Sequence, residues 1–299
     1  MEKQNIYTSL LSQDQEKKLY DAWHDTEVKA PPYAKWQLRP ENCVITCYTS
    51  GKTVFQGRDA AVYASAFINT EAHPIPQKSS TQKKPGSFPQ AGSDEVGTGD
   101  YFGPVCVCAT IVSPEDLSLL QELGVRDSKQ LNDDDIRRIA PKIMKQIPYS
   151  LLILEPAKYN EVHKDNNMNA IKSKLHNQAY VNLTKKYQLP SLKVIDQFTP
   201  ENLYYRYLKG EKEIIRGIHF ETKAEDKYPA VGSASMIARY AFLKCMDDME
   251  AKYDMHFQKG ASAKTDEDAR LFIQKYGIGR LNEVAKLHFK NTERATDQK

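Results

Sequence analysis

The stretch "AGSDEVGTGDYFGPVCVC", from Ala91 to Cys108, decides the fold of this chain. It places two acids, Asp94 and Glu95, side by side, then a glycine-rich segment, and then a run of alternating apolar residues. Such alternation is typical of a strand, and glycine permits a sharp turn before it. We therefore predict that one strand ends at the paired acids and that a second strand, "PVCVCATIV", begins after the turn.

The rest of residues 91–299 also alternates between strand and helix patterns. The runs "YSLLILEP", "SLKVIDQF" and "GIHFETK" are strand-like, and Asn132 is placed to cap a helix. A long helical pattern starts near Pro229 and carries small residues in its early turns, which would let it approach a sheet closely. This order predicts an α/β domain with one mixed sheet flanked by helices.

The residues before this domain divide into a module and a linker. Residues 1–75 predict a helix near 12–24, in which Ser12 and Gln15 form a capping box, followed by strands and a second helix. Residues 76–90 are rich in proline, lysine and serine and contain no acid, which is typical of a linker. We therefore expect a small α/β module ahead of the larger domain.

Composition excludes several classes of protein. The 299 residues are 40% apolar and 27% charged, which is ordinary for globular domains, and the net charge of +3 is too small to indicate a nucleic-acid partner by itself. No apolar run is long enough to span a bilayer or to form a signal core, so we expect a cytoplasmic protein. The five cysteines and the scattered histidines favour neither disulfides nor zinc.

Carboxylates recur at the predicted strand ends. Asp94 and Glu95 end the first strand, Asp196 ends "LKVID", and Glu225 follows "HFETK". A single acid at a strand end is usually solvated, although Asp196 stands where a buried strand would otherwise continue. Functional sites of α/β sheets gather at strand ends, so the four acids converge if their strands are neighbours.

Converging carboxylates would raise at least one pKa or open the site, unless a cation lies among them. Like charges at close range repel, and all-oxygen ligands favour Mg²⁺ or Mn²⁺ over zinc. Two such ions suit phosphoryl transfer because they stabilise both the attacking and the leaving oxygen. We therefore predict that Asp94, Glu95, Asp196 and Glu225 surround a divalent metal. Successive strand residues point to opposite faces, so the adjacent pair shares a site only if the strand twists or ends there.

Two further segments offer substrate contacts. The loop "GTGDYFG" contains Gly97, Thr98 and Gly99, and its backbone amides would suit close approach to a sugar-phosphate chain, although a tight hairpin explains the glycines equally well. The segment "RDSKQL" offers Ser128 and Lys129 for phosphate contact, although an ordinary helix entry is an equal alternative.

Four motifs in this order, "GSDEVGTGDYFGPVCV", "DSKQL", "VIDQF" and "TKAEDKYPAVGSASMIAR", resemble those of the bacterial type 2 ribonucleases H, and specifically of ribonuclease HIII. The resemblance covers most of residues 88–290. Ribonuclease HII usually carries an arginine between the two loop glycines and an aspartate at the fourth acidic position. This chain has Thr98 and Glu225 there, which follows the ribonuclease HIII pattern.

The resemblance implies a ribonuclease H-like fold, preceded by a substrate-binding module that resembles the TATA-binding protein. It implies endonucleolytic cutting of the RNA strand of RNA/DNA hybrids, which leaves 5′-phosphate and 3′-hydroxyl ends. Matched motif by motif, the four acids would hold Mg²⁺ or Mn²⁺. Gly97, Thr98 and Gly99 would contact the ribose 2′-hydroxyl, which distinguishes RNA from DNA, and Ser128 and Lys129 would contact phosphate.

The expected partner is therefore an RNA/DNA hybrid, with no organic cofactor and no membrane, and the expected state is a monomer. Two alternatives remain open from the sequence. One is another nuclease of the same broad fold, such as a junction resolvase, which would cut branched DNA. The other is a non-catalytic nucleic-acid-binding protein in which the acids merely end strands, and its binding would be indifferent to Mg²⁺.

Overall fold

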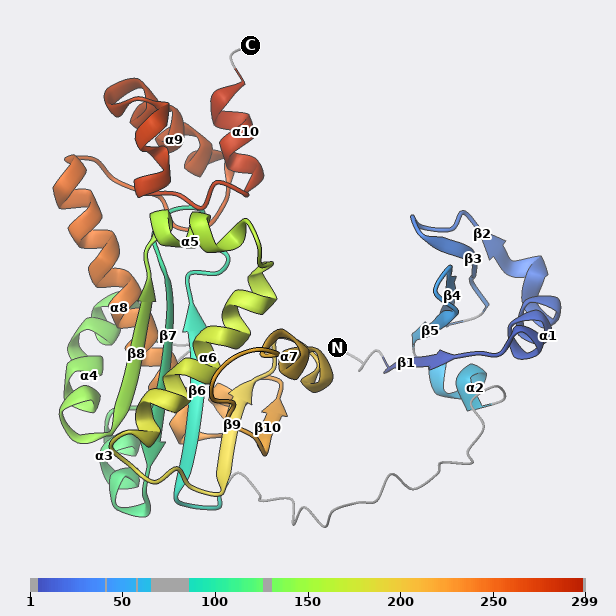
Figure 1. Ribbon diagram of the computed structural model, residues 1–299, viewed down its shortest axis with the longest axis horizontal. Coiled ribbons are helices and arrows are strands. Elements are labelled where there is room, and N and C mark those ends of the chain that lie inside the picture. The colour runs from blue at the N-terminus through green and yellow to red at the C-terminus, as the bar shows by residue number, and fades with distance from the viewer. Residues whose placement is uncertain (1–4, 41, 58, 66–85, 126–130, 298–299) are drawn as a thin grey trace. The chain divides into compact units, whose positions relative to one another are not determined.

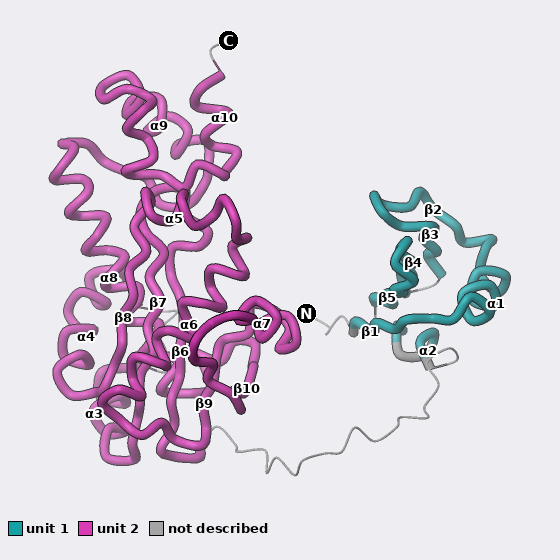
Figure 2. The backbone as a smooth tube through the Cα atoms, in the orientation of Figure 1, with its two compact units in different colours: residues 1–81 teal, residues 82–299 magenta. Residues whose placement is uncertain are grey.

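The computed structural model describes residues 5–40, 42–57, 59–65, 86–125 and 131–297. Ser128 and Lys129 lie outside these residues, as does most of the expected linker. The chain forms two compact units, residues 1–81 and 82–299, each with its own sheet and its own core (Figure 2). Among the described residues, no helix combines the length and the apolar character that crossing a membrane requires.

The first unit is a small α/β module, as predicted. Its five-stranded antiparallel sheet has the order β1-β5-β4-β3-β2 (Figure 1). Ser12 and Gln15 form the predicted capping box at the start of its first helix. The elements are β1 (Asn5–Leu10), α1 (Gln13–Trp23), η1 (His24–Thr26), β2 (Glu27–Val28), β3 (Ala34–Leu38), β4 (Cys43–Tyr48), β5 (Lys52–Gly57) and α2 (Ala60–Ser65).

The edge strand β1 is not predicted from the sequence. Two of its apolar side chains, Ile6 and Leu10, are 60% and 75% exposed, so burial does not impose an alternating pattern on this strand. Its pairing with β5, from Asn5 opposite Gly57 to Leu10 opposite Lys52, is set by backbone contacts with a segment far along the chain. Such contacts leave no local signal.

The second unit is built on a mixed sheet of the order β10-β9-β6-β7-β8. β6 pairs with β9 in parallel and with β7 antiparallel, while β10 runs parallel to β9 and β8 antiparallel to β7. The predicted mixed sheet is therefore confirmed. The strands are β6 (Gln90–Val96), β7 (Val105–Val112), β8 (Tyr149–Leu154), β9 (Leu192–Asp196) and β10 (Ile218–Glu221).

Helices cover both faces of this sheet (Figure 1). Asn132 caps α4 as predicted, because its side chain accepts a hydrogen bond from the Asp135 amide. The elements of this unit are η2 (Pro114–Asp116), α3 (Leu117–Glu122), α4 (Asp133–Gln146), α5 (Pro156–His163), α6 (Met168–Thr184), α7 (Glu201–Tyr207), η4 (Ala224–Asp226), α8 (Pro229–Tyr253), α9 (Ala263–Tyr276), η5 (Ile278–Glu283) and α10 (Lys290–Thr296).

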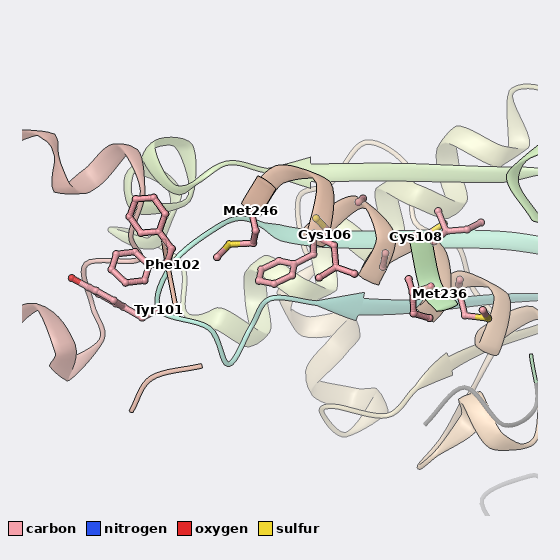
Figure 3. Close-up of a cluster of buried hydrophobic side chains, with 14 of the residues drawn as sticks. Tyr101, Phe102, Cys106, Cys108, Met236 and Met246 are labelled. Carbon is pink, nitrogen blue, oxygen red and sulfur yellow. The ribbon is translucent and has the colours of Figure 1, made fainter. Parts of the chain in front are cut away.

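The strand β7 is buried on both faces and divides the core in two. Figure 3 shows Cys106 and Cys108 on the α8 side, together with Met236 and Met246 from that helix. The intervening residues pack under α6 and α7 on the other side. The two sets from β7 are Cys106, Cys108 and Val112, and Val105, Val107, Ala109 and Ile111. The strand therefore shows apolar residues at successive positions, as buried strands do.

Candidate active site

The paired acids lie where the pairing of β6 with its neighbours changes. β6 pairs with β9 only as far as Ser93 opposite Ile195, so Asp94 and Asp196 are the next residues on two adjacent parallel strands. The other edge of β6 continues to pair with β7 up to Val96. Because the carboxyl ends of parallel strands meet at one edge of a sheet, the two aspartates come together there.

Asp94 is the most buried of the four acids, with 9% of its surface exposed. Its carboxylate accepts a hydrogen bond from the Glu95 amide at 2.8 Å. It is also hydrogen-bonded to the side chain of Ser235 on α8. Burial, followed by the charge of Glu95, raises the pKa of Asp94 to about 8. Asp94 is therefore mostly protonated at neutral pH.

Glu95 lies on the opposite face of β6, toward α6, because successive strand residues alternate. Its two carboxylate oxygens contact Lys172 Nζ and His176 Nε2, each at 2.8 Å. Burial by itself would raise the pKa of Glu95, but the hydrogen bonds and charges of His176 and Lys172 outweigh it and lower that pKa. Adjacent acids thus hold different protonation states.

Asp196 and Glu225 form the other half of the acidic site. The Asp196 carboxylate accepts a hydrogen bond from the Ala224 amide at 2.8 Å, which joins the end of β9 to η4, where Glu225 lies. Burial raises the pKa of Asp196, and the charges of Glu225 and Glu95 add to this effect. The carboxylates at the four predicted positions are therefore close enough to interact electrostatically.

Their chemistry fits a hard divalent cation. Within the described part of the chain, no three Asp, Glu, His or Cys side chains are already arranged around a common point to hold a metal ion. This agrees with the orientation of Glu95, which faces α6 while Asp94 faces α8. The donors are nevertheless carboxylate oxygens, which Mg²⁺ and Mn²⁺ prefer. Burial raises the pKa values of Asp94 and Asp196, and repulsion from neighbouring carboxylates adds to the effect, which a bound cation would relieve.

The glycine loop between β6 and β7 begins directly beside these acids. Gly97 has a φ of +95°, and a Cβ atom there would lie 2.2 Å from the Pro104 carbonyl oxygen, so only glycine fits. A Cβ atom on Gly99 would meet nothing within 4 Å. The part of the loop at Gly99 is therefore open.

The C-terminal segment holds the far end of the same loop. The Tyr101 amide donates to the Gly260 carbonyl, and the Gly103 amide donates to the Val284 carbonyl, both at 2.9 Å. Lys286 is fully buried, and its Nζ donates to the Gly103 carbonyl at 2.5 Å. Burial lowers the pKa of Lys286 to about 7. These contacts fix the loop from a region more than a hundred residues away in the chain.

Three basic residues near the site are missed by reasoning from the sequence. These are Lys172, His176 and Lys286. Lys172 and His176 are four residues apart on α6, which places both on one helix face. A lysine and a histidine at this spacing in a largely buried helix are the only local signal, and it does not identify the acid that they contact.

Comparison with known proteins identifies the family. The family described as Ribonuclease HII matches residues 91–292. A domain of unknown function matches residues 8–82. Ribonuclease HIII of Bacillus cereus is 42% identical over 287 residues, which cover 91% of each chain. The chain belongs to the ribonuclease HIII family. It is therefore a hydrolase of the ribonuclease H type. Ribonuclease HIII of Bacillus mycoides is 42% identical over 282 residues, which cover 89% of each chain.

Solved ribonuclease HIII structures share this fold. The crystal structure of Bst-RNase HIII in complex with Mn²⁺ matches with a TM-score of 0.69 at 36% identity, over 97% of this chain and 98% of that one. Aquifex aeolicus RNase H3 matches with a TM-score of 0.57 at 23% identity, over 95% of this chain and 100% of that one. The second likeness concerns the fold alone. Together these structures confirm the predicted ribonuclease H-like architecture.

Proposed function

We propose that this member of the ribonuclease HIII family hydrolyses the RNA strand of RNA/DNA hybrids and leaves 5′-phosphate and 3′-hydroxyl ends. The observation that carries the proposal is the meeting of Asp94 and Asp196 at the carboxyl ends of the parallel strands β6 and β9, close enough to Glu95 and Glu225 for their charges to interact. A junction resolvase would share the acids, but the family membership favours the hybrid. A non-catalytic nucleic-acid-binding protein would not need carboxylates that repel one another.

Asp94, Glu95 and Asp196 would hold Mg²⁺ or Mn²⁺, with Glu225 completing the site. The bound ions would supply activation of the attacking water and stabilisation of the leaving 3′-oxygen. Asp94 must release its proton as the site loads, because its pKa of about 8 keeps it mostly neutral at pH 7. Gly97, Thr98 and Gly99 would present backbone amides to the ribose 2′-hydroxyl, and Ser128 and Lys129 are proposed to contact phosphate.

The test is a cleavage assay with an end-labelled RNA/DNA hybrid in Mg²⁺ or Mn²⁺. Double-stranded DNA, double-stranded RNA and a four-way DNA junction serve as competing substrates, and EDTA serves as the metal-free control. We expect cutting of the RNA strand alone, and only with metal. Cutting of the junction, or metal-independent binding without cutting, would support the alternatives instead.

Thr98 predicts a limit on which substrates are cleaved efficiently. The arginine that ribonuclease HII usually carries between its loop glycines is replaced by this shorter, uncharged side chain. We expect weak cleavage at a single ribonucleotide embedded in duplex DNA and efficient cleavage of a continuous hybrid of the same length. Equal rates on the two duplexes would contradict a specificity role for this position.

The first unit is proposed to add affinity for the hybrid. It has its own buried core, which includes Leu19, Leu38 and Phe55, so its removal should leave the second unit folded. Deleting residues 1–80 is expected to raise KM for the hybrid with little change in kcat. Steady-state kinetics on the truncated and full-length proteins would test this, and an unchanged KM would refute it. The cytoplasmic location and the monomeric state remain predictions from the sequence.

A further inference from the structure

Two cysteines meet between the sheet of the second unit and the helix α8. Cys106 lies on β7 and Cys245 lies on α8, and their thiols are hydrogen-bonded to each other. Both are free thiols. Because the two side chains point toward each other from different elements, they have the relative orientation that a disulfide requires.

The two thiols differ in exposure and in acidity. Cys106 is fully buried, whereas Cys245 is partly exposed. The hydrogen bond from Cys106 lowers the pKa of Cys245, and the same bond, with burial, raises the pKa of Cys106. The carboxylates of Glu155 and Asp248 act to raise the pKa of Cys245 but do not outweigh the hydrogen bond. The thiolate is the reactive form of cysteine, so Cys245 is the member of the pair that an oxidant reaches first.

The pair lies beside both ends of the glycine loop. Cys106 is the second residue of β7, the strand that begins where the loop ends. Its partner across the sheet is Val96, the last residue of β6 before the loop begins at Gly97. A change at Cys106 is therefore next to the two points at which the loop leaves and rejoins the sheet.

The turn of α8 that carries Cys245 packs against the same loop. A Cβ atom on Gly97 would lie 3.1 Å from two ring carbons of Phe242, and one on Gly103 would lie 2.6 Å from the Met246 sulfur. Phe242 and Met246, on either side of Cys245 in the sequence, belong to the buried cluster that contains Cys106 (Figure 3). Because the loop backbone touches this turn directly, a movement of the turn displaces the loop.

We propose that Cys106 and Cys245 form a site of reversible oxidation, at which a hydroperoxide converts the two thiols into a disulfide that links β7 to α8. The Cys245 thiolate attacks the O–O bond and becomes a sulfenic acid, and the alkoxide that leaves takes up the proton that Cys245 released. The Cys106 thiol then attacks this sulfur. The S–S bond forms, the S–O bond breaks, and hydroxide leaves with the Cys106 proton as water. Two thiols are oxidised and one hydroperoxide is reduced, which yields one alcohol and one water.

The disulfide is expected to weaken cleavage of the hybrid. A covalent bond brings the two sulfur atoms closer together than a hydrogen bond does, so α8 and β7 are drawn toward each other at Cys245. This presses Phe242 and Met246 onto the loop at Gly97 and Gly103, where no free space remains. The loss of activity rests on the proposed function, in which this loop contacts the ribose. Formation of the disulfide does not.

The test treats the reduced full chain with hydrogen peroxide, blocks the remaining thiols by alkylation and maps the disulfide by mass spectrometry without reduction. We expect a bond between Cys106 and Cys245. Hybrid cleavage should fall by about tenfold or more, since a misplacement of about 1 Å can cost a hundredfold in rate. Dithiothreitol should restore it. Oxidised methionine requires its own reductase, so restoration by dithiothreitol assigns the effect to thiols.

Variants assign the effect to this pair. Cys245→Ala should cut the hybrid as the reduced parent does and should lose no activity with peroxide. Cys106→Ala is a second variant that removes the other thiol, and thermal unfolding shows that each variant is folded. Cys43→Ala is the matched control, because Cys43 is a buried thiol of the first unit. It should remain as sensitive to peroxide as the parent.

Three results would overturn the proposal: no bond between Cys106 and Cys245 after oxidation, a bond that leaves cleavage unchanged, or equal inactivation of Cys245→Ala and the parent. The proposed function fails separately. A reduced parent that does not cut the hybrid refutes that function, while the disulfide map still decides whether the oxidation site exists.

Discussion

Asp94→Asn is expected to lower the rate of hybrid cleavage by about a thousandfold or more while leaving the protein folded. Asparagine has nearly the same shape but lacks the charge that a cation requires. Loss of the stabilisation supplied by bound metal amounts to several kcal/mol, and each 1.36 kcal/mol corresponds to a factor of ten in rate. Single-turnover cleavage at saturating Mg²⁺ measures the effect on the chemical step.

The stability of this variant follows from the protonation of Asp94. Its folded-state pKa is raised from 3.8 to about 8, so between these pH values the folded state binds more protons than the unfolded state. The contribution of Asp94 to stability is therefore present at low pH and declines as the pH rises toward 8. Asparagine does not titrate. In EDTA at pH 8, Asp94→Asn is thus expected to unfold at the same temperature as the parent or at a higher one.

Asp254→Asn is the matched control for this experiment. Asp254 is fully exposed and takes a left-handed backbone conformation, which asparagine tolerates well. Its substitution should leave cleavage unchanged. Cleavage by Asp94→Asn within tenfold of the parent would contradict the assignment of Asp94 to the metal site. A large fall in its unfolding temperature at pH 8 would instead contradict the protonation argument.

Gly92→Ala is expected to destabilise the second unit by about 3 kcal/mol or more, since overpacking a well-filled core costs roughly 1–3 kcal/mol and occasionally more. Gly92 lies in β6, directly beneath the start of α8. A Cβ atom there would lie 2.3 Å from the Val231 amide nitrogen and 2.6 Å from the Ala230 carbonyl carbon. These are backbone atoms of α8, so no side-chain rotation relieves the contact, and the helix must move away from the strand.

The measurement is thermal unfolding of the full chain, in which the transition of the second unit should fall by roughly 6–12 °C. Gly279→Ala is the matched control, because a Cβ atom on Gly279 meets nothing within 4 Å and its φ is not in the left-handed region. It should unfold at nearly the parent temperature. An equal effect of the two substitutions would mean that α8 does not approach β6 as closely as the structure shows.

The sequence predicts those helices and strands that are determined by interactions between residues close together in the chain. The capping box of Ser12 and Gln15, the helix capped by Asn132 and the strand after the glycine loop all follow from hydrogen bonds or apolar spacing within a few residues. The motifs around the acids are sufficient for the family resemblance. The edge strand β1 has no such local signal, because only its pairing with β5 defines it.

The arrangement of the site depends on contacts between distant segments. The alternation of β6 places Asp94 and Glu95 on opposite faces, but only the packing of α8 and α6 gives them different surroundings and opposite pKa shifts. Lys172 is 77 residues from Glu95, and the register of β6 with β9 brings Asp196 beside Asp94. Residue types along the chain predict which groups are chemically able to act. Burial and charge around each group, which only the folded chain supplies, decide which of them are ionised and where they point.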